Sequence, residues 1–448
     1  MPRPPLLALA AVSAVLAAGA SAAQEGRPPN IVLVLTDDQG YGDLSCHGHP
    51  TIHTPALDAL AAQGLRATQF YVASPVCSPS RAALLTGCYP KRVGMHEHVV
   101  FPPDDHGLHT DEETLADLLR AAGYRTGCFG KWHLGHRPGL LPTDQGFDVY
   151  AGVPYSNDMS QYHRKPDAKY RFRLPWMVGD EVVEWEPDQR LLTERQTDAA
   201  IAFLEEDSAA PFFAYVAYSM PHIPIYASAA YEGRSTAGIY GDVIEEIDGN
   251  VGRLCAALER RGVADDTIVI FTSDNGPWLQ YGDRGGSAGP LRGGKGTNWE
   301  GGQRVPFVLR WPARIAPGRV VHDVVTTLDV APTLAALAGA SAPKRAIDGR
   351  DVSAVLFGET SQDAPPFLYY TSRGALAGIR RGPWKLLLES GALYHLERDV
   401  GEKRDVSEAN AERCADLRAL ALRMDAAIER DARPKLEVAE TLFDPARR

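Results

Sequence analysis

Asn30-Ile31-Val32-Leu33-Val34-Leu35-Thr36-Asp37-Asp38-Gln39-Gly40 is the stretch that decides the fold. Its unbroken apolar run is typical of a strand that is buried on both faces in a parallel sheet. Two adjacent carboxylates follow the run directly, and burying them is costly unless they are paired with cations or bind a metal ion. For an Asp-Asp pair alone, a solvated turn or a helix cap is an equally open interpretation.

The same pattern, an apolar run followed by polar side chains, occurs three more times. Tyr124–Phe129 precedes Lys131 and His133, Phe212–Tyr218 precedes His222, and Thr267–Phe271 precedes Asp274 and Asn275. Helical stretches separate these runs, so we predict a mostly parallel sheet that helices cover on both faces. Ligands bind at the carboxyl ends of the strands in such sheets, so these polar side chains are expected to share one site. Taken singly, a Lys-x-His pair or one His between prolines is more often surface or structural.

Helices are predicted where capping residues flank periodic apolar positions, namely at 55–63, 110–123, 193–206 and 243–262. About thirty residues after Asp158 show little periodicity, and we expect irregular surface structure there that lines a substrate cleft. Strand-like pieces at 367–371, 376–380, 384–388 and 393–396, then a helix near 410–429, predict a small antiparallel sheet with one helix. The expected fold class is α/β, with a catalytic domain over residues 27–350 and a smaller C-terminal subdomain over 351–448.

Cys77-Ser78-Pro79-Ser80-Arg81, followed by Ala82-Ala83-Leu84-Leu85-Thr86-Gly87, predicts a helix that Pro79 helps to begin and Gly87 ends. Cys77 would then lie just before the helix N-terminus, where free N–H groups and the helix dipole favour an anion. Arg81, one turn further on, can add its planar fork of donors. The alternative is a buried or disulfide-bonded cysteine, which is commoner in exported proteins.

The chain has 448 residues and a formal net charge of −11, and this acidic balance argues against nucleic acid as a partner. Residues 1–22 combine Arg3, an apolar run from Leu6 to Ala20 and a small-residue cleavage site, which predicts a secretory signal peptide. A membrane anchor is the alternative, but the run is short for a span, and no later stretch is apolar enough to cross a bilayer. The lack of an Asn-x-Ser/Thr sequon favours bacterial export, to the periplasm or the medium.

Six cysteines are present, so without Cys77 an odd number is left and at least one has no intramolecular partner. The strand ends offer three carboxylates and one amide oxygen, in Asp37, Asp38, Asp274 and Asn275. An all-oxygen set of this kind suits Ca²⁺ or Mg²⁺ rather than zinc. The glycine-rich loop 292–302 carries Lys295, but its spacing does not match a phosphate-binding P-loop.

The residues from Cys77 to Gly87 closely resemble the signature of the type I sulfatases. Further blocks resemble the arylsulfatase A-like members of this family: Leu-Thr-Asp-Asp-Gln-Gly-Tyr-Gly-Asp from Leu35, Gly-Lys-Trp-His-Leu-Gly from Gly130, Asp-Asn-Gly-Pro from Asp274, and Gly-Lys-Gly-Thr-Asn-Trp-Glu-Gly-Gly from Gly294. The resemblance runs from about Asn30 to about Leu396. It implies an alkaline phosphatase/sulfatase-like fold and the hydrolysis of aryl or carbohydrate sulfate esters.

The resemblance also implies the roles of the site residues. Cys77 would be oxidised to Cα-formylglycine by a formylglycine-generating enzyme, and Arg81 would support it. Ca²⁺, with Mg²⁺ less favoured, would be bound by Asp37, Asp38, Asp274, Asn275 and the modified residue 77. Lys131, His133, Ser156, His222 and Lys295 would hold the sulfate or move protons. His222 would protonate the leaving group, either alone or together with Lys295, and His133 would act in the second step.

Two alternative functions stay open from the sequence. One is hydrolysis of phosphate or phosphonate esters by the same superfamily, and the other is a secreted, catalytically silent glycan-binding protein. Asn157 stands where arylsulfatase A-type enzymes have a histidine, which leaves the alcohol part of the substrate undetermined. The sequence carries no signal for exo or endo action or for an oligomeric state.

Overall fold

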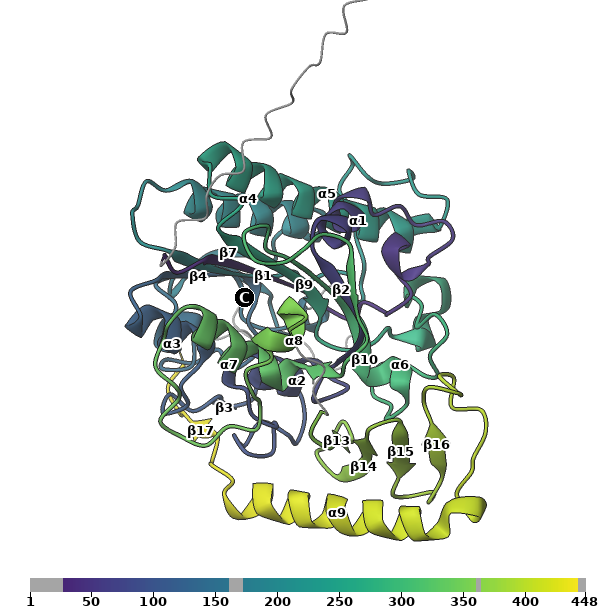
Figure 1. Cartoon of the computed structure of the whole chain (residues 1–448). Coiled ribbons are helices and arrows are strands. Elements are labelled where there is room, and N and C mark those ends of the chain that lie inside the picture. The colour runs from purple at the N-terminus through teal and green to yellow at the C-terminus, as the bar shows by residue number, and fades with distance from the viewer. Residues whose placement is uncertain (1–26, 161–171, 360–363, 442–448) are drawn as a thin grey trace, which may run out of the picture.

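The computed structural model describes residues 27–160, 172–359 and 364–441 (Figure 1). The predicted signal peptide, residues 1–22, lies outside these ranges. The described residues form a large sheet with the strand order β11-β2-β10-β9-β1-β8-β4-β5-β6-β7, and β12 pairs with β2. Its strands are β1 Asn30–Thr36, β2 Leu65–Tyr71, β4 Arg125–Lys131, β5 Val149–Val153, β6 Pro175–Val178, β7 Glu181–Trp185, β8 Phe212–Ala217, β9 Thr267–Ser273, β10 Arg304–Arg310, β11 Arg319–Val321 and β12 Val325–Thr326.

The centre of this sheet is parallel, as the apolar runs predict. β9, β1, β8, β4 and β5 run side by side in one direction, with Leu33 of β1 opposite Tyr215 of β8 and Ile270 of β9. These three side chains are buried. Antiparallel strands flank the parallel centre, β10 on one side and β6 with β7 on the other.

Helices cover both faces of the sheet (Figure 1). The described α-helices are α1 Pro55–Gln63, α2 Cys77–Thr86, α3 Leu115–Ala121, α4 Leu192–Glu205, α5 Gly238–Arg261, α6 Glu300–Gln303, α7 Thr327–Leu337, α8 Ser353–Phe357 and α9 Ala411–Arg430. Along β1, Leu33 belongs to the apolar core that includes side chains of α2, α3, α7 and α8, whereas Val34 belongs to the core that includes those of α1, α4 and α5. Alternate residues of one strand thus join two separate cores, which explains the continuous apolar runs.

Two local predictions were wrong. The helix expected at 110–123 begins only at Leu115, because Thr114 and Asp117 form a capping box that fixes the start there. The segment expected to be irregular contains β6 and β7, an antiparallel pair that extends the sheet, while residues 161–171 lie outside the described ranges. β6 has only four residues, and the edge strand β7 is partly exposed, so neither gives a long apolar run.

The C-terminal part forms the predicted antiparallel sheet and helix. Its strands are β13 Phe367–Tyr370, β14 Leu376–Arg381, β15 Trp384–Leu387 and β16 Leu393–His395, and α9 packs against them. Beyond α9, β17 Leu436–Glu437 returns to pair with β3 His106–Gly107. The domain boundary at residue 350 stays a prediction. No helix in the described ranges is long and apolar enough to cross a membrane.

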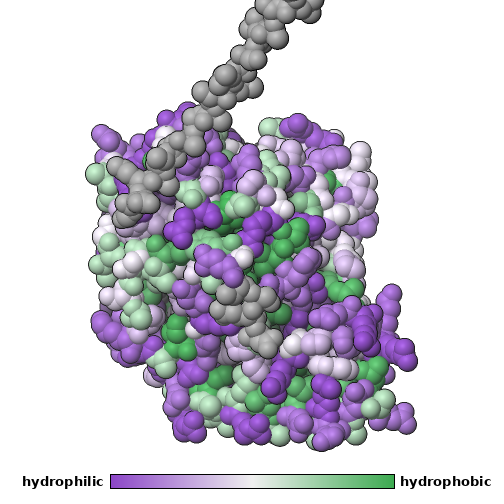
Figure 2. All heavy atoms as spheres, in the orientation of Figure 1, coloured by the Kyte–Doolittle hydropathy of each residue, from purple (hydrophilic) through white to green (hydrophobic). Residues whose placement is uncertain are grey.

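Hydrophilic and hydrophobic residues are mixed on the face of the molecule drawn in Figure 2. Figure 2 shows small hydrophobic areas that hydrophilic residues divide on the face drawn there. All six cysteines are free thiols, so the fold depends on its apolar cores and buried ion pairs rather than on disulfides.

Candidate active site

The ends of neighbouring strands bring the predicted site residues together. β1 pairs with both β8 and β9, and β4 pairs with β8, so the segments that follow these strands meet at one edge of the sheet. The side chains concerned are buried: Asp37, Asp38, Lys131, His222, Asp274 and Asn275. The sheet topology therefore gathers one lysine, one histidine and four oxygen-bearing side chains into one cluster.

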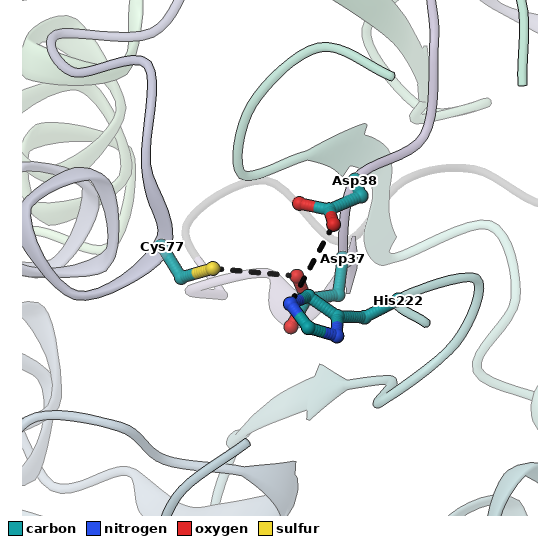
Figure 3. Close-up of side chains that lie close together, drawn as sticks. All are labelled: Asp37, Asp38, Cys77 and His222. Carbon is teal, nitrogen blue, oxygen red and sulfur yellow. Dashed lines mark hydrogen bonds and ion pairs between the residues drawn. The ribbon is translucent and has the colours of Figure 1, made fainter. Parts of the chain in front are cut away.

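Helix α2 places Cys77 beside this cluster. The helix starts at Cys77, after Val76 in extended conformation, and ends at Gly87 in left-handed conformation. Cys77 therefore forms the first helical residue rather than the one before it. Its Sγ lies 3.5 Å from Asp37 Oδ1 and 3.6 Å from Lys295 Nζ (Figure 3 shows Cys77 facing Asp37). Burial and the nearby Asp37 carboxylate raise the pKa of the Cys77 thiol, so the unmodified thiol stays protonated at neutral pH.

Arg81, one turn along α2 from Cys77, has a buried side chain that binds several neighbouring segments. Its Nε and Nη2 lie 3.0 and 2.8 Å from Asp274 Oδ2, and Nη2 also lies 3.0 Å from Asp37 Oδ2. Nη1 donates to the backbone oxygen of Lys131 at 2.7 Å. A planar guanidinium with three fixed partners holds α2, β4 and β9 in one arrangement. This geometry fits the supporting role that the family resemblance implies.

Two lysines balance the two consecutive carboxylates after β1. Lys131 donates from Nζ to Asp37, and Lys295 Nζ lies 2.6 Å from Asp38 Oδ1. Burial alone would raise the pKa of Asp37, but Lys131 and its other cationic neighbours hold that pKa well below its usual range. Lys295 also lies over the Trp278 ring at 4.3 Å, which fixes its direction. Positive charge thus faces residue 77 from the loop and from the sheet.

The cluster also has the donors for a divalent cation. One atom from each of Asp37, Asp38, Cys77 and His222 lies within 4.8 Å of the others (Figure 3). Asn275 stands beside them, because its Nδ2 donates to Asp38 Oδ1 at 2.7 Å. Its Oδ1 is buried and makes no hydrogen bond to the described residues, so a hard cation would satisfy it.

Asp274 completes the oxygen donors. Its Oδ1 accepts the Asp38 backbone N–H at 3.2 Å, whereas its Oδ2 is occupied by Arg81. Burial and the charge of Asp37 raise the pKa of Asp274 to about 6. The carboxylates of Asp37, Asp38 and Asp274 therefore repel one another, and a divalent cation would relieve that repulsion.

His222 presents one nitrogen to the cluster. Its Nδ1 lies 2.6 Å from the Ile223 backbone oxygen, which fixes the proton there, while its Nε2 lies 3.6 Å from Asp38 Oδ2. The ring is 5.4 Å from the ring of Trp278, centroid to centroid. Burial and the charge of Lys295 lower the pKa of His222, so this ring is neutral at rest.

His133 lies in a turn beyond the end of β4. β4 ends at Lys131 and His133 has φ of 65°, so the two residues do not lie on one extended strand. The His133 Nε2 lies 3.0 Å from the Val100 backbone oxygen, and its Nδ1 is buried and has no partner among the described residues. Burial and the charge of Lys131 hold the pKa of His133 well below its usual range.

Ser156 lies on the segment that contacts the His222 loop. It precedes the short 3-10 helix η3 Asn157–Met159, and its Oγ is buried without a hydrogen-bond partner in the described residues. The neighbouring Asn157 donates from Nδ2 to Pro224 O at 3.1 Å and to Gln189 Oε1 at 3.0 Å. Within the described part of the chain, no hydrogen bond joins the Ser156 hydroxyl to the other predicted residues, so it remains available to a ligand.

A buried network that the sequence did not reveal supports the Lys295 loop. Glu300 begins α6 directly after this loop, and its Oε1 lies 3.0 Å from Lys385 Nζ of β15. Lys385 also lies 2.8 Å from Glu402 Oε1, and Glu402 accepts the Glu300 backbone N–H at 2.7 Å. All three side chains are buried. The C-terminal sheet is therefore anchored to the loop that carries Lys295.

Comparison with known proteins shows which sequences and structures this chain resembles. The family model described as Sulfatase matches residues 29–340, and that of the C-terminal part of N-sulphoglucosamine sulphohydrolase matches 294–420. Arylsulfatase A of Homo sapiens is 42% identical over 414 residues, 86% of this chain and 77% of that protein. N-acetylgalactosamine-6-sulfatase of Mus musculus is 40% identical over 397 residues, 85% of this chain and 74% of that protein. The crystal structure of Ps i-CgsB in complex with k-i-k-neocarrahexaose is similar with a TM-score of 0.80, at 30% identity, covering 91% of this chain and 94% of that one.

Proposed function

Since this chain belongs to the sulfatase family and is a sulfuric ester hydrolase, we propose that it cleaves aryl or carbohydrate sulfate esters with a nucleophile made from Cys77. The observation that carries this proposal is the place of Cys77. It forms the first residue of α2, at the positive end of the helix, with Asp37 Oδ1 and Lys295 Nζ 3.5 and 3.6 Å from its sulfur. A sulfate ester seated against Lys295 would present its sulfur atom to residue 77.

The chemistry at residue 77 depends on a modification. Oxidised to formylglycine and hydrated, residue 77 would supply a nucleophilic hydroxyl together with a second hydroxyl that serine and cysteine lack. A formylglycine-generating enzyme is the partner that this maturation requires. Arg81 lies one turn along the same helix and, through Asp37 and Asp274, holds the start of the helix in place.

The charges of the site match the sulfate group. Lys131 and Lys295 would bind its oxygens, and the free hydroxyl of Ser156 would donate to it from the side. Asp37, Asp38, Asp274 and Asn275 would hold Ca²⁺, with Mg²⁺ less favoured because it demands a stricter octahedral geometry. The cation would neutralise charge on the sulfuryl oxygens. Since Lys131 and Lys295 pair with Asp37 and Asp38 in this structure, a cation on the two carboxylates would leave both lysines available to the substrate.

Two histidines have the geometry for proton transfer. His222 has its Nδ1 proton on Ile223 and its Nε2 directed at the cluster, so Nε2 would first take up a proton from solvent and then give it to the departing oxygen, with Lys295 as the second candidate donor. His133 has its Nε2 on Val100 and a buried, unpartnered Nδ1 among the described residues, so it would accept a proton from residue 77. The two proton transfers therefore fall on different residues.

The substrate class follows from the sulfate group and from the relatives. N-acetylgalactosamine-6-sulfatase acts, by its name, on a sulfated sugar, and the similar structure holds an oligosaccharide. We therefore expect sulfated sugars to be substrates, and nitrophenyl sulfate to serve as a test substrate. We also propose that residues 1–22 direct the chain out of the bacterial cytoplasm.

The experiment compares nitrophenyl sulfate with nitrophenyl phosphate, using enzyme made in a host that modifies Cys77. The expected result is a higher kcat/KM for the sulfate, and almost no turnover by Cys77→Ser, which lacks the second hydroxyl. A higher kcat/KM for the phosphate would favour the phosphate or phosphonate ester alternative. Turnover of neither ester, with Cys77 modified and a panel of sulfated sugars also inert, would favour the silent glycan-binding alternative.

A further inference from the structure

A second group of metal-binding side chains lies outside the active site. One ligand atom from each of His98, Asp104 and His106 lies within 4.8 Å of the other two. We propose that these three residues form a binding site for Zn²⁺ or a similar borderline metal ion. Two imidazoles and one carboxylate make a three-ligand set that leaves a fourth position for water, as in open zinc sites.

The hydrogen bonds of His98 and Asp104 leave one atom of each free for a metal. His98 Nδ1 lies 2.6 Å from the Val99 backbone oxygen and 3.8 Å from Asp104 Oδ2, so this nitrogen carries the proton and Nε2 keeps its lone pair. Asp104 Oδ2 accepts the Phe101 backbone N–H at 2.8 Å, which leaves Oδ1 available. Metal-binding histidines and carboxylates are commonly oriented by such outer contacts.

The site is open to solvent, although its side chains are partly buried. The side chains of His98, Asp104 and His106 are 44%, 21% and 12% exposed, so an ion can enter without unfolding the segment. The His98 and His106 rings meet edge to face with their centroids 5.6 Å apart. Glu97 and Asp105 add negative charge nearby, and the Lys435 ammonium is itself engaged by Glu97 at 3.1 Å. Arg137 also lies nearby, with its Nε donating to the Asp104 backbone oxygen at 3.1 Å, so the site has charges of both signs around it.

The segment between His98 and His106, which the ion would join at both ends, contacts residues of the active site. Between the ligands, the backbone oxygens of Val100 and Pro102 contact the ring nitrogens of His133 and His136 at 3.0 and 2.9 Å. The Val100 N–H donates to Ser78 Oγ, next to Cys77, at 3.0 Å. An ion bound to both ends of the segment would hold this wall of the active site in place. It would also steady β17, because His106 pairs with Glu437.

The test uses the full-length protein, saturated with Ca²⁺ so that hard-cation sites are filled, and titrated with Co²⁺ as a spectroscopic probe. We expect one equivalent of Co²⁺ with visible absorption of an imidazole-bound ion. This equivalent should be lost in His98→Asn and in His106→Asn. It should remain in His109→Asn, a matched control, because His109 also lies beside an acid, Asp111, but stands outside the cluster.

Cys77→Ser separates this site from the active site, whose Cys77 and His222 could also bind Co²⁺. The cobalt signal should be unchanged in Cys77→Ser; its loss there, or its persistence in both His98→Asn and His106→Asn, would overturn the proposal. Thermal unfolding gives an independent readout. Zn²⁺ should raise the Tm of the wild type and of His109→Asn. It should not raise the Tm of folded His98→Asn or Asp104→Asn. An equal rise in all four proteins would also overturn the proposal.

Discussion

Arg81 and Asp274 form a buried ion pair that joins helix α2 to the end of β9, with Arg81 Nε and Nη2 lying 3.0 and 2.8 Å from Asp274 Oδ2. Neither side chain is exposed to solvent. The same guanidinium also binds Asp37 and the backbone of Lys131. Residue 77 is thus positioned by a network that connects three strand ends.

Replacing Arg81 by Gln should lower the free energy of unfolding by about 3–5 kcal/mol, because Asp37 and Asp274 would be left buried with less compensating charge. Urea unfolding at neutral pH measures this change. Arg120→Gln is the control, since Arg120 pairs with Asp117 on the surface of α3 and such pairs contribute little. If Arg81→Gln lost no more free energy of unfolding than the control, Arg81 would not hold these segments together.

Replacing His222 by Ala should affect substrates according to their leaving groups. A sugar alkoxide needs a proton to depart, so kcat/KM for a sugar sulfate should fall roughly 10²–10⁴-fold. Nitrophenolate leaves without a proton, so the loss with nitrophenyl sulfate should be distinctly smaller. Steady-state kinetics with both substrates measures the contrast.

His133→Ala provides the comparison for His222→Ala. His133 is expected to act on residue 77 rather than on the leaving group, so its replacement should slow both substrates alike. If His222→Ala also slowed both alike, His222 would be a packing residue between Pro221 and Pro224, and Lys295 would become the candidate acid.

Replacing Lys385 by Met should destabilise the protein and impair the site from a distance. Glu300 and Glu402 would face each other without their shared cation, at a cost of about 3–5 kcal/mol in unfolding free energy. Because Glu300 follows the Lys295 loop directly, kcat/KM for nitrophenyl sulfate should also fall in the folded fraction. Lys344→Met, which removes an exposed lysine paired with Glu113, should change neither quantity. Equal behaviour of the two variants would show that the buried network does not matter.

Asp43 should make stability depend on pH. Burial raises its pKa from 3.8 to about 7, although Tyr240 and two backbone N–H groups oppose this rise. A carboxyl whose pKa is higher in the folded state stabilises the fold fully below its unfolded pKa, and this contribution is lost as the pH rises through about 7. Between the unfolded pKa and the folded pKa, the Asp43 contribution should fall by about 1.4 kcal/mol per pH unit.

Chemical denaturation of the wild type and Asp43→Asn across that pH range tests this expectation. The difference in pH slope between the two proteins is the quantity to compare, since the asparagine side chain cannot titrate whatever the absolute stability of the variant. Identical slopes would mean that the Asp43 carboxylate is ionised in the folded protein, with Tyr240 as its principal donor.

The central strands and the residues that follow them were predictable because a strand buried on both faces has a continuous run of apolar residues. β1 and β9 read as continuous apolar runs, and each is followed at once by the polar residues of the site. The predicted start of α3 was wrong because Thr110 and Thr114 both have an acid three residues on, Glu113 and Asp117, and only in the folded chain is it evident that Thr114 and Asp117 form the capping box. The first residue of α3 thus depends on the capping contact and not on the spacing of apolar residues alone.

The contacts between distant segments could not be predicted. Glu300, Lys385 and Glu402 each read as ordinary surface charges, and only the folded chain brings them together in a buried network. The strands β6 and β7 were missed because each is short, and because Glu181 and Glu184 interrupt the apolar residues of β7. The turn at His133 also depends on the fold, since its ring is held by Val100 from another segment.

The most direct test of the account is the mass of the peptide that contains residue 77, taken from enzyme that turns over a sulfate ester. We predict a peptide that is lighter than the unmodified one by the difference between a CH₂–SH and a CHO side chain. The fraction of the peptide in this lighter form should rise in proportion to kcat among preparations. Fully active enzyme whose Cys77 peptide carries only the unmodified thiol would contradict the central claim that the nucleophile is made from Cys77.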